Sequence, residues 1–232
     1  MYRYCNLEHY NKEKNVYEFS LDLENIFCAS NGSQNDIFEG LPISNYDIHP
    51  VEECLKKLSE LAYSKCFTED FKNNLMWAHY ADGYRGVCIK YDINMMDDEN
   101  ILRSIFPVSY IKNRSIYASI DWLFDFFLEE KHANSRADSK GIFLQKAKHW
   151  EYEKEWRICF MNDTYAKGTK YIKKSFKCVS AIYLGPRISK ENEASVIQSV
   201  KQYENKYNST IKIYKMYLDE VTYEIKEKEI IY

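Results

Sequence analysis

Residues 146–157 read KAKHWEYEKEWR, a density of charged and aromatic side chains that an ordinary solvated segment does not need. The stretch contains two tryptophans, one tyrosine, three carboxylates and four fixed positive charges. We expect a strand from Glu153 onward, in which the two-residue period places Glu153, Glu155 and Arg157 on one face. The stretch therefore predicts an ionic face, and we place the candidate chemistry there.

Glu153 and Glu155 are the candidate catalytic residues. Two carboxylates this close repel each other, so one of them would have a raised pKa unless Lys146, Lys148 or Arg157 neutralises it. Such a pair suits a general base or a group that grips a hydroxyl. The alternative is that Glu153, Glu155 and Arg157 form a ladder of surface ion pairs, each worth under ~1 kcal/mol.

A second polar group lies at residues 35–39. Asn35, Asp36 and Glu39 fit a turn in which polar side chains satisfy their own backbone. As a site, Asp36 and Glu39 would join the two glutamates of the 146–157 stretch around Mg²⁺, because hard carboxylate oxygens suit this ion. A metal-dependent nuclease or phosphodiesterase would need little more.

Aromatic and basic residues elsewhere complete a predicted cleft. Trp77 and Tyr80 belong either to the core or to a platform that stacks on a ring. Arg85 precedes Gly86 at a helix-to-strand turn, which lets the backbone approach a phosphate closely. The predicted ligand is a nucleotide or another phosphorylated small molecule, bound by Arg3, Tyr4, Asn35, Asp36, Glu39, Trp77, Tyr80, Arg85, Lys146, Trp150 and Arg157.

Composition and charge narrow the class of protein. A chain of 232 residues with 45% hydrophobic and 29% charged residues fits one soluble domain over residues 1–232. The net charge of -3 argues against a general polyanion binder. Without a long apolar run or a signal-peptide start, we expect a cytoplasmic protein without membrane contact. Seven cysteines without a C-x-x-C pair indicate buried reduced thiols, not a zinc site or a disulfide frame.

Hydrophobic periodicity predicts an α+β fold. Helices are expected mainly in the first half and strands mainly in the second, in a mixed or antiparallel sheet. Pro107 should place its strand at an edge or a bulge, and the last two strands should form a hairpin split by Asp219 and Glu220. The predicted helices cover 51–62, 73–82, 116–128 and 190–206, and the predicted strands cover 1–5, 64–69, 85–91, 103–110, 170–176, 179–184, 210–217 and 221–232. An exposed loop is expected at 133–140.

Several segments together resemble a bacterial family, the domain of unknown function 2971. The resemblance runs over about residues 1–190, and Ile37 departs from it where the family commonly has proline. It implies a cytoplasmic bacterial protein and carries no activity. The matching residues are Tyr2, Arg3 and Tyr4; Asn35, Asp36, Phe38 and Glu39; Cys66, Phe67, Met76, Trp77, Tyr80, Ala81, Gly83, Arg85 and Gly86; and Lys146, Trp150, Tyr152, Glu153, Glu155, Trp156 and Arg157.

A Glu-x-Glu pair on a late strand with an arginine on the first strand is also similar to the layout of ADP-ribosyltransferases. This resemblance implies that Glu155 holds the nicotinamide ribose and that Arg3 holds the phosphates of NAD. A middle strand of the Ser-Thr-Ser type is absent from the sequence.

Three functions follow as hypotheses. The first is NAD-consuming ADP-ribosyl transfer or NAD hydrolysis, with a protein or nucleic acid as acceptor, as in bacterial toxins and phage-defence effectors. The second is the Mg²⁺-dependent nuclease, and the third is a non-catalytic module that senses a nucleotide or a partner. Under the first, Glu155→Gln is expected to abolish turnover and to leave the fold stable.

Overall fold

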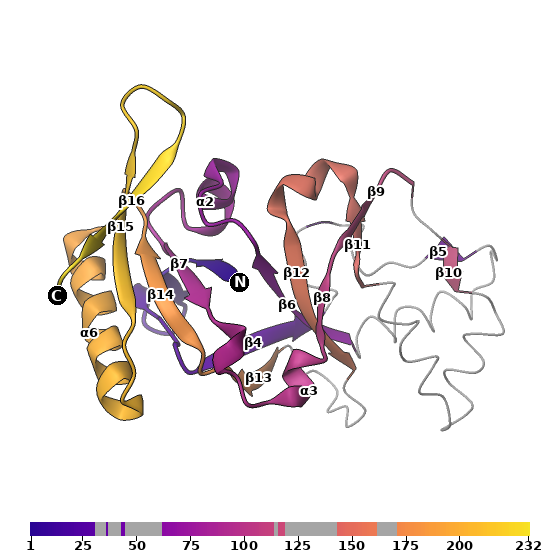
Figure 1. The fold of residues 1–232 in the computed structure, drawn as a ribbon, viewed down its shortest axis with the longest axis horizontal. Coiled ribbons are helices and arrows are strands. Elements are labelled where there is room, and N and C mark those ends of the chain that lie inside the picture. Colours follow the sequence, from indigo (N-terminus) through magenta and orange to yellow (C-terminus); the bar gives the residue numbers. More distant parts are fainter. Residues whose placement is uncertain (31–35, 37–42, 45–61, 114–115, 119–142, 162–170) are drawn as a thin grey trace. The chain divides into compact units, whose positions relative to one another are not determined.

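The computed structural model describes residues 1–30, 36, 43–44, 62–113, 116–118, 143–161 and 171–232 (Figure 1). The chain divides into two compact units. Unit 1 comprises Met1–Ile26, Phe67–Leu102 and Lys174–Tyr232, and unit 2 comprises Phe27–Cys66 and Arg103–Lys173. The predicted α+β class, with a mixed sheet and a strand-rich C-terminal half, is confirmed. Whether the chain acts as one domain stays a prediction.

Unit 1 is built on a sheet in the order β1-β7-β14-β15-β16. Adjacent strands of this sheet run antiparallel, except β14 and β15. These two run parallel because helix α6 connects them. A separate hairpin joins β2 and β3. The elements are β1 (Tyr2–Cys5), β2 (Glu8–Asn11), β3 (Val16–Phe19), α2 (Asn74–Tyr80), β7 (Val87–Tyr91), η2 (Ile93–Met95), α3 (Glu99–Leu102), β14 (Val179–Leu184), α6 (Lys190–Tyr207), β15 (Lys212–Leu218) and β16 (Ile225–Ile230).

The core of unit 1 lies around the central strands. Val87 and Ile89 of β7 and Ile182 of β14 are fully buried, as expected for strands covered on both faces. Helix α6 begins after Ser189, whose side chain accepts a hydrogen bond from the backbone N–H of Asn192. Its buried residues Val196, Val200 and Tyr203 recur at helical spacing, so one stripe of α6 contributes to the core.

The turn after α2 is held by close backbone contacts. Asp82, Gly83 and Tyr84 all have positive φ angles, of 48°, 57° and 73°. A Cβ at Gly86 would lie 2.1 Å from the carbonyl oxygen of Cys5, so only glycine lets this turn pack against β1. The turn is therefore a fixed part of unit 1.

Unit 2 contains shorter strand pairs. Strand β12 pairs antiparallel with β8, β11 runs parallel to β9, and β10 runs parallel to β5. Strand β4 pairs antiparallel with β6 through Ala29 and Ser64. The elements are β4 (Asn25–Ser30), β5 (Ile43–Ser44), β6 (Ala62–Thr68), β8 (Ile105–Pro107), β9 (Ser109–Ile111), β10 (Ile116–Ala118), β11 (Gln145–Ala147), η3 (Lys148–Glu153), β12 (Glu155–Met161) and β13 (Tyr171–Ser175). The unit boundary falls inside β4, β6 and β13.

Most of the predicted elements are confirmed, and two differences are informative. The helix predicted over 116–128 is wrong at its start, because Ile116–Ala118 forms β10 in a pair with β5. The hairpin of β2 and β3 was not predicted, since its exposed strands show little apolar alternation. Pro107 ends β8, which pairs with β12 alone among the described strands, so the predicted edge position is confirmed.

Some predictions fall outside the described residues, namely those for 51–61, the rest of 116–128 and the loop at 133–140. Ala62, the last residue of the helix predicted over 51–62, begins strand β6. Within the described residues, no helix combines the length and the apolar character that crossing a membrane requires.

Candidate functional site

The 146–157 stretch folds as a short strand, a turn of 3-10 helix and a second strand. The predicted strand begins at Glu155, not at Glu153. Glu153 instead ends η3, and Lys154 follows in the left-handed region with φ of 44°. The expected single ionic strand face is therefore wrong at Glu153, because the left-handed residue breaks the two-residue period.

Four charged side chains of this stretch nevertheless meet. Lys146 Nζ bonds Oε2 of Glu153 and lies 3.0 Å from Oε2 of Glu155. Arg157 grips Glu155 with two bonds, Nε to Oε1 at 2.6 Å and Nη2 to Oε2 at 2.9 Å. Arg157 Nη1 also donates to the carbonyl oxygen of Phe143 at 2.7 Å. We call Lys146, Glu153, Glu155 and Arg157 the ion cluster.

The ion cluster is buried. Arg157 is 1% exposed, Glu153 3%, Glu155 4% and Lys146 8%. The alternative of a surface ladder formed by Glu153, Glu155 and Arg157 is therefore wrong. Two positive and two negative charges balance within the cluster, which is the condition under which buried charges are tolerated.

Glu155 is held in its ionised form. Burial by itself would raise the pKa of this carboxyl, but Arg157, Lys146 and a hydrogen bond from the Cys66 thiol outweigh it and lower the pKa to about 2. The Glu155 backbone N–H donates to the Tyr110 hydroxyl at 2.7 Å. Burial raises the pKa of Tyr110 to about 12, so this hydroxyl stays protonated.

The cluster as it stands is closed to a ligand. Both carboxylate oxygens of Glu155 are bound, and Lys146 Nζ lies 5.0 Å from the centre of the Trp150 ring in a cation–π contact. A substrate hydroxyl would have to displace one cation before it could reach Glu155. In this geometry the four charges hold β11, η3 and β12 together.

The group at residues 35–39 falls mostly outside the described residues. Asn35 and Glu39 are not described, whereas Asp36 is. Among the residues that the structure describes, no three or more His, Cys, Asp and Glu side chains gather as a metal site would require. The Mg²⁺-dependent nuclease thus stays a prediction from sequence.

Arg3 lies on β1 of unit 1 and is half-buried. Its guanidinium makes one hydrogen bond, from Nε to Cys5 Sγ at 2.9 Å, and within the described part of the chain no carboxylate lies within salt-bridge distance of it. Four of the five N–H donors of an arginine are then left for another acceptor. Burial would lower the pKa of Arg3, but Cys5, Tyr91 and Asp22 outweigh it and raise the pKa.

Tyr91, which sequence reasoning missed, lies beside Arg3. Arg3 pairs with Ile89 of β7, and Tyr91 stands two residues further along the same strand face. The Tyr91 hydroxyl is buried and has no hydrogen-bond partner. Burial raises its pKa above the usual value, and the nearby charge of Arg3 works in the opposite direction. The pairing of β1 with β7, which brings these side chains together, leaves no local signal in the sequence.

The aromatic candidates of unit 1 are mainly core residues. Trp77 is fully buried, and its Nε1 donates to the carbonyl oxygen of Phe71 at 2.8 Å. Tyr4 packs against it edge to face at 5.1 Å and donates its hydroxyl to the Asp70 carbonyl oxygen. Tyr80 is half-buried. For Trp77 this burial favours the core interpretation that the sequence left open.

Arg85 is exposed and already paired. Its Nε lies 2.8 Å from Oδ2 of Asp82, and its Nη2 lies 2.9 Å from Oδ1. The turn after α2 places both residues three apart, so the guanidinium fork is used within the turn. A phosphate at Arg85 would have to compete with this carboxylate.

The comparisons with known proteins give one match. The family model described as a protein of unknown function, DUF2971, matches residues 76–158. The matched segment begins in α2 and ends in β12, so it includes all four residues of the ion cluster. No curated protein and no solved structure matches the chain.

Proposed function

We propose that this chain, whose residues 76–158 match the DUF2971 family model, binds a nucleotide or another phosphorylated small molecule through Arg3. The observation that supports the proposal is that Arg3, a half-buried residue, makes one hydrogen bond with its guanidinium and has no carboxylate within salt-bridge distance among the described residues. Phosphate oxygens are the acceptors that match this fork, because two parallel N–H bonds reach one phosphoryl group.

Tyr91 strengthens the case for a ligand at Arg3. A buried hydroxyl without a partner loses about 1–3 kcal/mol relative to a satisfied one. Arg3 and Tyr91 share one face of adjacent strands, so a ligand oxygen that entered the space beside both side chains would accept this hydrogen bond. Arg85 has its fork occupied by Asp82, so Arg3 is the better candidate for the phosphate.

As a second function, we propose NAD-consuming ADP-ribosyl transfer or NAD hydrolysis, with Glu155 of unit 2 as the catalytic carboxylate. The ionised state of Glu155 supports this role, because the reaction needs an anionic carboxylate near the nicotinamide ribose. The cations bound to Glu155 work against it. Binding without turnover is therefore the function that the geometry supports best, and NAD turnover is the second.

Titration of the purified chain with ADP and with NAD in a calorimeter tests the binding proposal. Arg3→Gln is expected to weaken ADP binding by about tenfold or more, which corresponds to the loss of a charge-assisted bond of about 1.5–3 kcal/mol. Arg3→Lys should restore part of the affinity, since it keeps the charge and loses the fork. Arg85→Gln is the matched control and should change the affinity little.

Nicotinamide release from NAD, measured with the same preparations, separates the two functions. Release by the wild type would support turnover, and ADP and NAD binding without release would support a sensing module. Equal ADP affinity in wild type and Arg3→Gln, with both proteins folded by circular dichroism, would reject the phosphate role of Arg3.

A further inference from the structure

Cys5 of β1 combines partial exposure with a direct contact to a guanidinium. Arg3 Nε donates to Cys5 Sγ at 2.9 Å, and the Cys5 thiol donates to the Arg3 carbonyl oxygen at 3.7 Å. Cys5 is half-buried, unlike the four cysteines that are buried among the described residues. Reactive cysteines are partly exposed and lie beside a positive charge, whereas buried structural cysteines are inert. Cys5 therefore has the surroundings of a reactive thiol.

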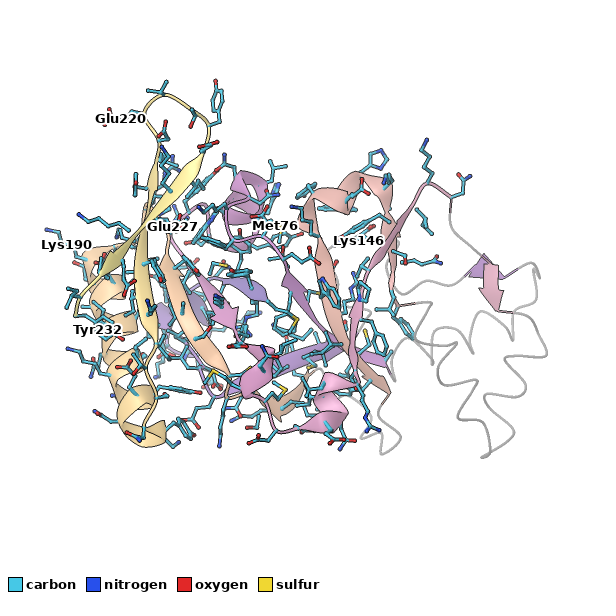
Figure 2. All side chains as sticks on the ribbon, in the orientation of Figure 1. Met76, Lys146, Lys190, Glu220, Glu227 and Tyr232 are labelled. Atoms are coloured by element: carbon cyan, nitrogen blue, oxygen red, sulfur yellow. The ribbon has the colours of Figure 1, made fainter. Side chains whose placement is uncertain are left out.

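Cys66 is the natural comparison, because it is the other half-buried cysteine of the described residues. Its thiol donates a hydrogen bond to Glu155 of the ion cluster, which Lys146 marks in Figure 2. Cys66 thus has a similar exposure to Cys5, but its thiol donates to a carboxylate instead of accepting from a guanidinium. It serves as an internal control for the chemistry of Cys5.

The face of the sheet that carries Cys5 lacks a hydrogen-bond acceptor. Within the described residues, Arg3 makes one hydrogen bond with its guanidinium and has no carboxylate within salt-bridge distance. Tyr91 is 2% exposed, and its hydroxyl has no hydrogen-bond partner. Burial raises the pKa of Tyr91, the charge of Arg3 works against this, and Cys5 adds to it, so both side chains lie close enough to act on this hydroxyl. An oxygen carried by Cys5 Sγ would supply an acceptor without any ligand having to enter.

The strand register excludes one product of Cys5 oxidation. Cys5 stands opposite Val87, and Tyr4 stands opposite Cys88. Because side chains alternate between the two faces of a sheet, Cys88 points away from the face that carries Cys5 and Arg3. A disulfide between Cys5 and Cys88 is therefore not the product.

We infer that Cys5 is an oxidation site whose sulfenic acid occupies the guanidinium of Arg3. The thiolate of Cys5 attacks a hydroperoxide such as hydrogen peroxide. The Sγ–O bond forms as the O–O bond breaks, the sulfur gives up two electrons, and the hydroxide that leaves takes up the proton of the thiol to become water. The new oxygen lies within reach of Arg3, since Sγ already contacts Nε, and it accepts the N–H bonds that a phosphate would otherwise receive.

Trapping of sulfenic acid with dimedone, followed by peptide mass spectrometry of the full chain, tests the modification. Limiting hydrogen peroxide should label Cys5 about tenfold faster than Cys66. Arg3→Gln should slow labelling of Cys5 by about tenfold, and Arg3→Lys should slow it less, because it keeps the positive charge. Arg85→Gln, which removes an exposed guanidinium of the same unit, is the matched control and should leave the rate unchanged.

Two results of the labelling experiment would overturn the inference. One is equal labelling of Cys5 and Cys66 in the native wild type, which needs no variant. The other is an unchanged rate at Cys5 in folded Arg3→Gln. A disulfide between Cys5 and Cys88 in peptides mapped without reduction would contradict the expected product.

Calorimetry with ADP tests the consequence for Arg3, and this part rests on the proposed function. Treatment with hydrogen peroxide, followed by removal of the oxidant, should weaken ADP binding by about tenfold, and dithiothreitol should restore it. Cys5→Ser keeps an acceptor for Arg3 Nε but forms no sulfenic acid, so its ADP affinity should be the same before and after treatment.

The two experiments separate the two proposals. Labelled Cys5 with undiminished ADP binding, or an equal loss of binding in treated Cys5→Ser, would overturn the occupation of Arg3 by the oxidised sulfur. Absence of ADP binding in the untreated chain would reject the nucleotide function, while dimedone labelling would still decide whether Cys5 is the oxidation site.

Discussion

At the scale of single residues, Glu155 is the position where we expect a substitution to affect the stability of the fold most. It begins β12, is 4% exposed and shares its two oxygens between Arg157 and Lys146. A buried ion pair adds little by itself to stability, but removing one member leaves an uncompensated charge in the interior. The expectation that Glu155→Gln leaves the fold stable therefore has to be revised, because the variant would leave the cluster with one surplus positive charge.

Glu155→Gln is expected to lower the free energy of unfolding by about 3–5 kcal/mol at pH 7. The pKa of Glu155 is lowered from 4.5 to about 2, so its contribution is present above the unfolded value and is lost as the pH falls from 4.5 toward 2. Urea unfolding at pH 7, 4 and 3 should show the difference between wild type and variant shrinking with pH.

Glu151→Gln is the matched control for this measurement. Glu151 stands in the same stretch, but its ion pair with Lys148 is exposed, so its loss should cost under ~1 kcal/mol. If Glu155→Gln and Glu151→Gln were equally stable at pH 7, the ion cluster would not hold η3 and β12 together as described.

At the scale of elements, α6 shows how local sequence signals fix a helix. Ser189 caps its first turn, Asn208 ends it with a left-handed φ of 48°, and the buried stripe faces the core. The helix is also the crossover between the parallel strands β14 and β15. Its stability therefore bears on the sheet that carries Arg3.

Ser189→Ala should lower the free energy of unfolding by about 1 kcal/mol, because the N–H of Asn192 loses its acceptor. Ser195→Ala, in the middle of the same helix, is the control. There the hydroxyl only bonds the Glu191 carbonyl oxygen, and alanine is the better helix former, so a change of about 0.5 kcal/mol or less in the stabilising direction is expected. Thermal unfolding followed by circular dichroism measures both variants, and an equal loss in the two would contradict the cap.

At the scale of the whole molecule, we predicted from the sequence that the cysteines are reduced and buried. Among the described residues this prediction is confirmed for most of the cysteines. Cys28, Cys88, Cys159 and Cys178 are buried, Cys5 and Cys66 are half-buried, and none of these six forms a disulfide bond. Burial raises the pKa of Cys178 to about 12 and raises that of Cys88 well above the usual value. Both thiols are therefore protonated and unreactive at neutral pH.

Alkylation with iodoacetamide followed by peptide mass spectrometry should show that the buried thiols react more slowly than a half-buried one. In the native protein at pH 7.5, Cys5 is expected to react before Cys88 and Cys178, and all three should react at similar rates in urea, because unfolding restores an ordinary pKa of ~8.5. Rapid labelling of Cys88 in the native chain would show that β7 is not buried as described.

The sequence by itself determined the local elements of this protein. Apolar periodicity located β1, α2, β7 and α6, because this signal arises between residues a few positions apart. Only the tertiary structure decided that Lys146, Glu153, Glu155 and Arg157 are buried, and that Tyr91 accompanies Arg3. The physical reason is that burial and strand pairing depend on residues far apart in the chain, and a left-handed residue such as Lys154 redirects side chains that a regular strand would align.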